Sequence, residues 1–142
     1  MKQIALISVY NELNYNMAIL YRLLKERKPE ESISHKEMPT PAEHREFVET
    51  KHFKYWYMIQ SLEEKDYPYV GAIYLSKANE IGINIFDKYK RQHYGCVAVQ
   101  ALMDFHPEKY YYANINPENY KSKELFKKLG FKFSTYMKDL NT

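Results

Sequence analysis

The segment KRQHYGCVAVQALM, residues 90–103, joins a short basic loop to an apolar pattern with helical spacing. Gly95 stands at the junction, and we expect a helix from about Gly95 to Phe105 whose packed face carries Ala98, Val99, Leu102 and Met103. Free backbone N–H groups and the helix dipole at such a start attract anions such as phosphate. Lys90 and Arg91 add positive charge. The segment therefore predicts an anion-binding loop, although basic loops before helices are also typical of solvated surfaces.

Strands are expected immediately upstream of this loop. Residues 54–63 and 67–76 are apolar runs separated by a charged turn, which predicts an antiparallel hairpin. Residues 80–87 predict a third strand, in which Ile81, Ile83 and Ile85 alternate. Downstream, residues 109–115 predict a strand, residues 119–129 a helix closed by Gly130, and residues 131–140 a last strand.

The N-terminal third predicts a strand and two helices. Residues 3–10 indicate the strand, and the spacing of Leu13, Met17, Leu20 and Leu24 predicts a helix over residues 12–28, ended by Pro29. Thr40 and Glu43 form a predicted capping box for a short helix that presents Phe47 and Val48. The whole order of elements predicts a mixed α/β domain with a central sheet.

Composition narrows the class of protein. The 142 residues, 45% hydrophobic and 27% charged, suit one domain over residues 1–142, and no apolar run is long enough to span a bilayer. The one cysteine, Cys96, excludes an internal disulfide and favours a cytoplasmic location; we interpret it as a small helix-start residue rather than a nucleophile. The net charge of +3 is spread over scattered lysines, which argues against a nucleic-acid binder. AT-rich codon usage accounts for most of the 15 tyrosines.

The segment from Asn119 to Phe131 carries a family resemblance. It reads N-x-x-S-x-x-L-F-x-x-L-G-F and resembles the N-x-x-[AS]-x-x-L-Y-x-x-x-G-F signature of the GNAT superfamily of acetyl-CoA-dependent N-acetyltransferases. GCVAVQALM is similar to the start of the helix that follows the pyrophosphate loop of that family. The resemblance covers about residues 40–135. It implies the GNAT fold, a central mixed, mostly antiparallel sheet flanked by helices, with acetyl-CoA as co-substrate and no metal.

The resemblance also implies where the cofactor binds. Backbone atoms of residues 92–96 would hold the pyrophosphate, and the pantetheine arm would lie between residues 82–86 and 111–115. The implied cofactor contacts are Ile85, Phe86, Lys90, Arg91, Gln92, His93, Tyr94, Gly95, Cys96, Asn119, Ser122 and Phe126.

Two positions depart from the family pattern. The family loop reads [QR]-x-x-G-x-[GA], which places His93 where glycine allows a positive φ; a slipped register, Gln92-x-x-Gly95-x-Val97, is the less favoured alternative because it moves the helix face. Many GNAT enzymes have a tyrosine at the place of Phe126, and its hydroxyl can protonate the leaving thiolate. Here water or another group would serve, with Ser122, Tyr120 and Tyr136 as the candidates; CoA thiolate is a fair leaving group at neutral pH.

The acceptor side is less defined by the sequence. Glu80, which opens the strand lining the site, is a candidate base acting through water, or else a solvent carboxylate at a strand edge. Asn119 is a second catalytic candidate, although helix capping alone accounts for it. The candidate substrate contacts are His35, His44, Tyr55, Tyr57 and Asn114, with Tyr55 and Tyr57 on the sheet face opposite Trp56.

The arrangement P-x-x-x-E-H-x-x-F followed by YWYMI is loosely similar to GNAT enzymes that acetylate amino-sugar nucleotides. No His, Cys or Asp cluster has metal-ligand spacing. The sequence therefore predicts an N-acetyltransferase acting on a primary amine of a small molecule, amino sugar-like, or of a protein. A catalytically weak acyl-CoA-binding module is the alternative. Acetyl-CoA and an amine acceptor are the expected partners, a membrane or nucleic acid is not expected, and homodimer formation is left open.

Overall fold

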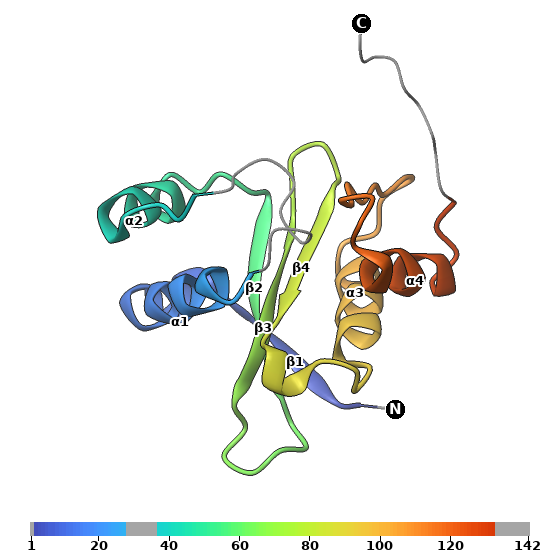
Figure 1. Ribbon diagram of the computed structural model, residues 1–142, viewed down its shortest axis with the longest axis horizontal. Helices are drawn as coiled ribbons and strands as arrows, with labels where there is room; N and C mark the ends of the chain where they lie inside the picture. The colour runs from blue at the N-terminus through green and yellow to red at the C-terminus, as the bar shows by residue number, and fades with distance from the viewer. Residues whose placement is uncertain (1, 28–36, 133–142) are drawn as a thin grey trace, which may run out of the picture.

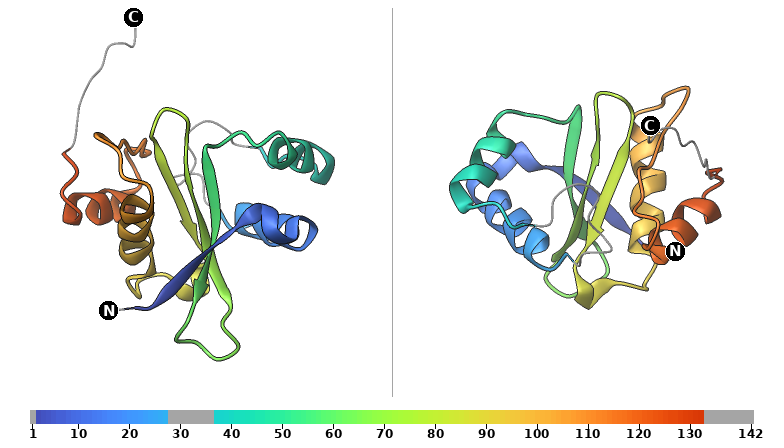
Figure 2. Two further views of the ribbon diagram at one scale, coloured as in Figure 1. Left: turned by 180° about the vertical axis from the view of Figure 1, so that it is seen from behind. Right: turned by 45° about the horizontal axis from the view of Figure 1, so that its top comes forward.

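A computed structural model describes residues 2–27 and 37–132. Its centre is an antiparallel sheet in the order β1-β2-β3-β4, formed by β1 (Ile4–Ser8), β2 (Tyr55–Ser61), β3 (Tyr69–Leu75) and β4 (Ile81–Ile85). Helices α1 (Leu13–Lys25) and α2 (Pro41–Glu49) cover one face, and α3 (Tyr94–Phe105) and α4 (Tyr120–Lys128) cover the other (Figures 1 and 2). Short 3-10 turns, η1 (Val9–Glu12) and η3 (Asp87–Tyr89), lead out of β1 and β4. The predicted α/β architecture is confirmed.

The helices on the first face begin and end close to the predicted positions. The predicted capping box of α2 is present, because the Glu43 N–H donates to Thr40 Oγ1 at 3.1 Å and the Thr40 N–H donates to Glu43 Oε1 at 2.8 Å. The helix buries Val48, whereas Phe47 remains 39% exposed. Helix α1 starts one residue later than expected, after η1, and Pro29 lies outside the described residues.

On the second face, β4 supplies an apolar surface for α3 and α4. Ile81, Ile83 and Ile85 pack into one cluster with apolar residues of both helices, so the predicted alternation is confirmed. A Cβ on Gly95 would lie 2.6 Å from the end of the Leu125 side chain. The absence of a side chain at Gly95 therefore lets α4 approach the start of α3.

The strand predicted over residues 109–115 is wrong. Within the described chain this segment makes one parallel bridge, Glu80 with Tyr112, in which the Ile81 N–H donates to the Tyr112 carbonyl at 2.7 Å. Beyond Tyr112 it leaves β4, and Asn114, Ile115 and Asn116 face a cavity instead. Beta pairing requires both backbones to stay adjacent, and here they separate after one bridge. The last predicted strand, apart from Phe131 and Lys132, lies outside the described residues.

Candidate active site

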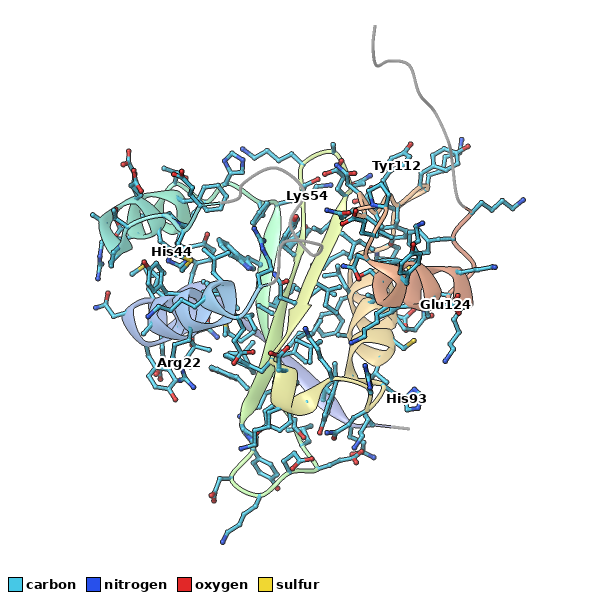
Figure 3. All side chains as sticks on the ribbon, viewed as in Figure 1. Arg22, His44, Lys54, His93, Tyr112 and Glu124 are labelled. Atoms are coloured by element: carbon cyan, nitrogen blue, oxygen red, sulfur yellow. The ribbon has the colours of Figure 1, made fainter. Side chains whose placement is uncertain are left out.

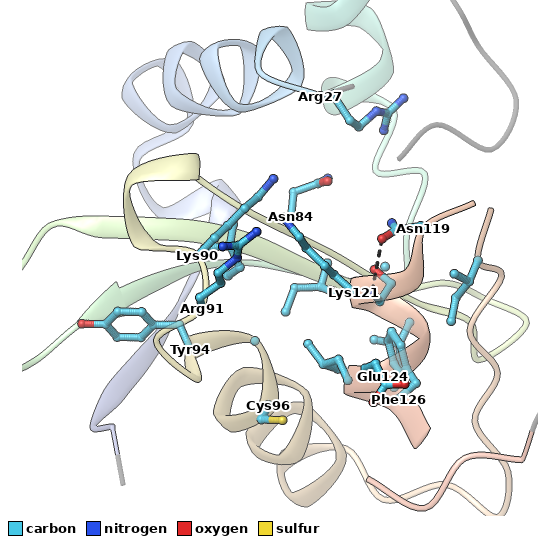
Figure 4. A pocket seen from close by; sticks show the side chains of 18 of the residues that line it. Arg27, Asn84, Lys90, Arg91, Tyr94, Cys96, Asn119, Lys121, Glu124 and Phe126 are labelled. Atoms are coloured by element: carbon cyan, nitrogen blue, oxygen red, sulfur yellow. Dashed lines mark hydrogen bonds between the residues drawn. The ribbon is translucent and has the colours of Figure 1, made fainter. Parts of the chain in front are cut away.

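A cavity of about 580 Å³ lies along the free edge of β4. Strand β4 forms one wall, while residues 114–116 and the exposed side of α4 form the opposite wall. The loop from Lys90 to Gly95 closes a third side, and α1 residues approach from across the sheet edge (Figure 4). Because β4 is the edge strand beyond its one bridge to Tyr112, the cavity reaches both faces of the sheet.

Backbone groups of β4 are directed into this cavity. The N–H of Ile81 points outward to the Tyr112 carbonyl. Hydrogen-bonding direction alternates along an antiparallel strand, so the backbone N–H and C=O groups of Ile83 and Ile85 face the same open side. An exposed strand edge of this kind pairs with extended ligands that carry amide groups. The pantetheine arm of CoA has this chemistry.

The loop before α3 has the geometry that the sequence predicted for an anion. Arg91 and His93 adopt positive φ values of 63° and 70°, and α3 begins at Tyr94 without a side-chain cap. His93 thus adopts the positive φ that glycine allows at the matching place of the family loop. The N–H groups of Tyr94, Gly95 and Cys96 therefore lack helical acceptors, and such a helix start attracts phosphate. Lys90 lines the cavity and pairs with Asp87 at 2.9 Å.

Tyr94 anchors this helix start to the sheet. Its side chain is buried, and its hydroxyl forms a hydrogen bond of 2.8 Å with Ser61 Oγ on β2. In Figure 4 the ring points away from the cavity, whereas Cys96 stands on the nearby turn of α3. Gln92 is not among the lining residues, and its side chain donates to the Lys88 carbonyl at 3.4 Å.

Helix α4 brings the signature residues to the opposite wall. Asn119 is the N-cap, and its side-chain oxygen accepts the Ser122 N–H at 3.1 Å, which confirms the capping interpretation (Figure 4). Its catalytic role stays a prediction. Phe126 is almost fully buried and packs edge-on against Phe131 with ring centres 5.0 Å apart. Asn119, Ser122 and Phe126 all line the cavity.

Of the candidate substrate contacts, the structure brings Asn114 to the cavity and leaves three others away from it. His44 is buried between α1 and α2, edge-on to Tyr21, where burial lowers its pKa (Figure 3). Tyr55 and Tyr57 stack with His106, and the Tyr57 hydroxyl shares a hydrogen bond of 2.6 Å with His106 Nε2. His35 lies outside the described residues.

Glu80 and Phe86 flank the cavity without lining it. Glu80 sits at the bridge to Tyr112, where its N–H donates to Ser76 Oγ at 2.9 Å. Phe86 turns into the core beneath the Arg22 guanidinium. The remaining predicted cofactor contacts, Ile85, Arg91, His93, Tyr94, Gly95 and Cys96, line the cavity.

Sequence reasoning missed several lining residues. These are chiefly Leu23, Glu26 and Arg27 of the α1 end, Tyr74 of β3, Asn84 of β4 and the charged α4 residues Lys121, Glu124 and Lys128. Gly82 was the available signal for Tyr74, because glycine inside a strand often marks a close approach by another group. The α1 residues gave no local signal, since they reach the cavity only through tertiary packing.

An edge strand that separates from residues 114–116, a basic positive-φ loop and an open helix start agree with the GNAT fold that the sequence resemblance implied. The family model described as the acetyltransferase (GNAT) domain matches residues 17–132, so the chain belongs to the GNAT acetyltransferase family. Among solved structures, the fold is similar to a domain from Methanocaldococcus jannaschii DSM 2661. The TM-score is 0.77 and the identity 24%, over 98% of this chain and 94% of that one. A search of curated proteins found no match.

None of the helices in residues 2–27 and 37–132 has the length and apolar character needed to cross a membrane. Within the same ranges, no three His, Cys, Asp or Glu side chains gather as a metal-binding group.

Proposed function

We propose that this GNAT domain transfers the acetyl group of acetyl-CoA to a primary amine, either of an amino sugar-like small molecule or of a protein. The observation that carries the proposal is the cavity along the free edge of β4. The same space meets the open start of α3, for the pyrophosphate, and the outward N–H and C=O groups of Ile83 and Ile85, for the pantetheine amides.

The chemistry is a direct transfer. The neutral amine nitrogen attacks the thioester carbonyl carbon, a C–N bond forms, the C–S bond breaks, and the thiolate leaves with the electron pair. Outward N–H groups of β4 are suited to polarising the carbonyl oxygen. Glu80 takes the ammonium proton through water in this scheme, and water protonates the thiolate because Phe126 carries no acidic hydrogen.

A catalytically weak acyl-CoA-binding module is the second candidate. Two features favour it. His93 places a side chain at a positive φ in the anion loop, and the hydrophobic Phe126 occupies the cavity wall where a hydroxyl would serve as acid. Neither feature blocks the free edge of β4, so both candidates predict acetyl-CoA binding and differ only in turnover.

Calorimetry and thermal unfolding with acetyl-CoA test the part that both candidates share. A hundredfold excess over Kd should stabilise the folded state by about 2.7 kcal/mol. An amine panel, followed by release of the CoA thiol, then separates the candidates. Binding without turnover of any amine supports the module, whereas no heat and no change in melting temperature removes both.

A further inference from the structure

Tyr74 crosses β4 to reach the cavity. It is paired with Gly82 in the β3–β4 register, and a Cβ on Gly82 would lie only 2.1 Å from Cζ of the Tyr74 ring. The ring therefore lies flat over the glycine. It extends across β4, and the hydroxyl lies toward the open side where β4 and residues 114–116 separate. Tyr74 lines the cavity on this side.

The position of the Tyr74 hydroxyl is fixed, and it still has hydrogen-bonding capacity. Phe53 stacks on the ring with centres 3.7 Å apart and planes 3° from parallel. The hydroxyl forms no hydrogen bond with any residue in the described ranges. Burial raises the pKa of Tyr74, and the Glu80 carboxylate raises it further, while the Arg27 guanidinium lowers it. The hydroxyl thus stays protonated at neutral pH and is a donor.

Arg27 supplies a cation beside this hydroxyl. It follows α1, is half-buried and lines the same cavity, where Figure 4 shows it across the space from α4. Its side chain forms no ion pair or hydrogen bond with a described residue. The neighbouring Glu26 is engaged elsewhere, because its Oε1 accepts the Asp87 N–H at 2.9 Å. A half-buried guanidinium that has no carboxylate partner among residues 2–27 and 37–132 is suited to a bound anion.

The anions of the cofactor have another place in the cavity. Lys90, Arg91 and the start of α3 form the loop side of the cavity, and Figure 4 shows Arg27 at the end of the cavity away from Tyr94 and Cys96 of α3. Arg27 and Tyr74 belong to the α1 side of the sheet edge, where the acceptor would approach the thioester from the face opposite α3 and α4. Their charge and donor capacity are therefore available to the acceptor.

We propose that the acceptor is an amine that also carries an anionic group, a carboxylate or a phosphate, and that the Arg27 guanidinium and the Tyr74 hydroxyl bind this group. The inference rests on the proposed function, since it assigns the acceptor of that reaction. It disfavours purely cationic acceptors such as polyamines, whose additional ammonium groups would be repelled by Arg27.

Matched acceptor pairs test this inference and identify the anion. Comparing β-alanine with β-alaninamide tests whether a carboxylate is recognised. Comparing phosphoethanolamine with ethanolamine tests whether a phosphate is recognised. Acetylation is followed by CoA thiol release, and binding to the complex with CoA by calorimetry. We expect the charged member of at least one pair to have the higher kcat/KM and the tighter binding, by about 10- to 100-fold, the span of a charge-assisted hydrogen bond.

Three variants assign the effect to these residues. Arg27→Gln should remove the preference for the charged member, through KM, and leave the neutral member and the acetyl-CoA Kd unchanged. Tyr74→Phe should lower the preference several-fold. Arg22→Gln is the matched control, because Arg22 lies exposed on the same helix against Phe86 and outside the cavity lining, so the preference should remain.

Several outcomes would overturn the inference. One is a kcat/KM for the neutral acceptor of each pair that equals or exceeds that for the charged acceptor. Another is an Arg27→Gln variant that binds the charged and neutral acceptors equally more weakly, or that loses affinity for acetyl-CoA. A wild-type complex that binds none of the four amines also counts against it. Binding of a charged amine without any acetylation would instead contradict the proposed function, while the Arg27-dependent anion preference would persist.

Discussion

Replacing Gly82 by alanine should destabilise the fold through one side chain, Tyr74. The new Cβ would lie 2.1–2.4 Å from Cζ, Cε2 and the hydroxyl oxygen of Tyr74, distances that no relaxed structure retains. The ring must leave its place over β4, and its stack on Phe53 must break or tilt. Because both β3 and β4 are held by ladder pairing, the ring moves rather than the backbone.

Opposing contributions set the size of the effect. Overpacking of this kind costs about 1–3 kcal/mol, and loss of the aromatic stack costs about 0.5–1.5 kcal/mol. Replacing a strand glycine by alanine returns about 0.5–1 kcal/mol of backbone entropy. We therefore expect a net loss of about 2 kcal/mol, which corresponds to a fall in Tm of about 4–8 °C for a chain of this size.

A double-mutant cycle measured by urea unfolding isolates the clash. In a Tyr74→Val background the obstructing ring atoms are gone, so Gly82→Ala should become neutral or stabilising by about 0.5–1 kcal/mol. Gly71→Ala is the matched control, because its new Cβ would meet the Asn84 carbonyl oxygen at 2.2 Å. That obstacle is backbone, and Tyr74→Val should not relieve it.

The Tyr74 ring is not the obstacle if Gly82→Ala lowers the free energy of unfolding by less than about 0.5 kcal/mol in the natural sequence. The same conclusion follows if the loss is equal in the natural and Tyr74→Val backgrounds. The first result would mean that the ring has another place of equal energy. The second would mean that the strain lies in the β4 backbone instead. Either would also weaken the argument that Gly82 directs the Tyr74 hydroxyl into the cavity.

Three further predictions concern the loop, the base and a buried histidine. His93→Gly relieves a positive φ of 70° and should raise stability by about 1 kcal/mol and tighten acetyl-CoA binding in calorimetry; weaker binding would show that the imidazole contacts the cofactor. Glu80→Gln should lower turnover by about two to four orders of magnitude, with less loss at high pH and an unchanged acetyl-CoA Kd, and full activity at neutral pH would remove Glu80 from the mechanism. Burial lowers the pKa of His44, so below about pH 6.5 the unfolded chain binds a proton at this residue more readily than the folded chain does. The free energy of unfolding should therefore decrease as the pH is lowered from about 6.5, until the pH passes below the folded-state pKa. In urea unfolding at pH 7 and pH 5, His44→Leu should reduce this difference, and an unchanged difference would assign it to other groups such as His106.

The position of the anion loop and its helix follows from local sequence, as does the family. Side-chain periodicity decides which face of β4 carries Ile81, Ile83 and Ile85, and a capping box closes within four residues at Thr40 and Glu43. The Asn119-to-Phe131 signature likewise spans one helix, its two caps and the two residues that follow, and the family model covering residues 17–132 confirms the resemblance it indicated. Such features require no knowledge of what packs beside them, since each is set by residues a few positions apart.

Tertiary structure alone decided where the chain leaves β4 and which side chains meet there. Three consecutive tyrosines in residues 109–115 favour a strand, but pairing stops at Tyr112 because the two backbones separate. This separation is not a property of either segment. The same holds for Tyr74 of β3 and for Arg27, the second residue after α1, which reach one cavity only through strand register and helix packing. His44 packs against Tyr21, and Tyr55 and Tyr57 stack with His106, instead of lining the cavity. These contacts also depend on which distant element the fold places beside each side chain.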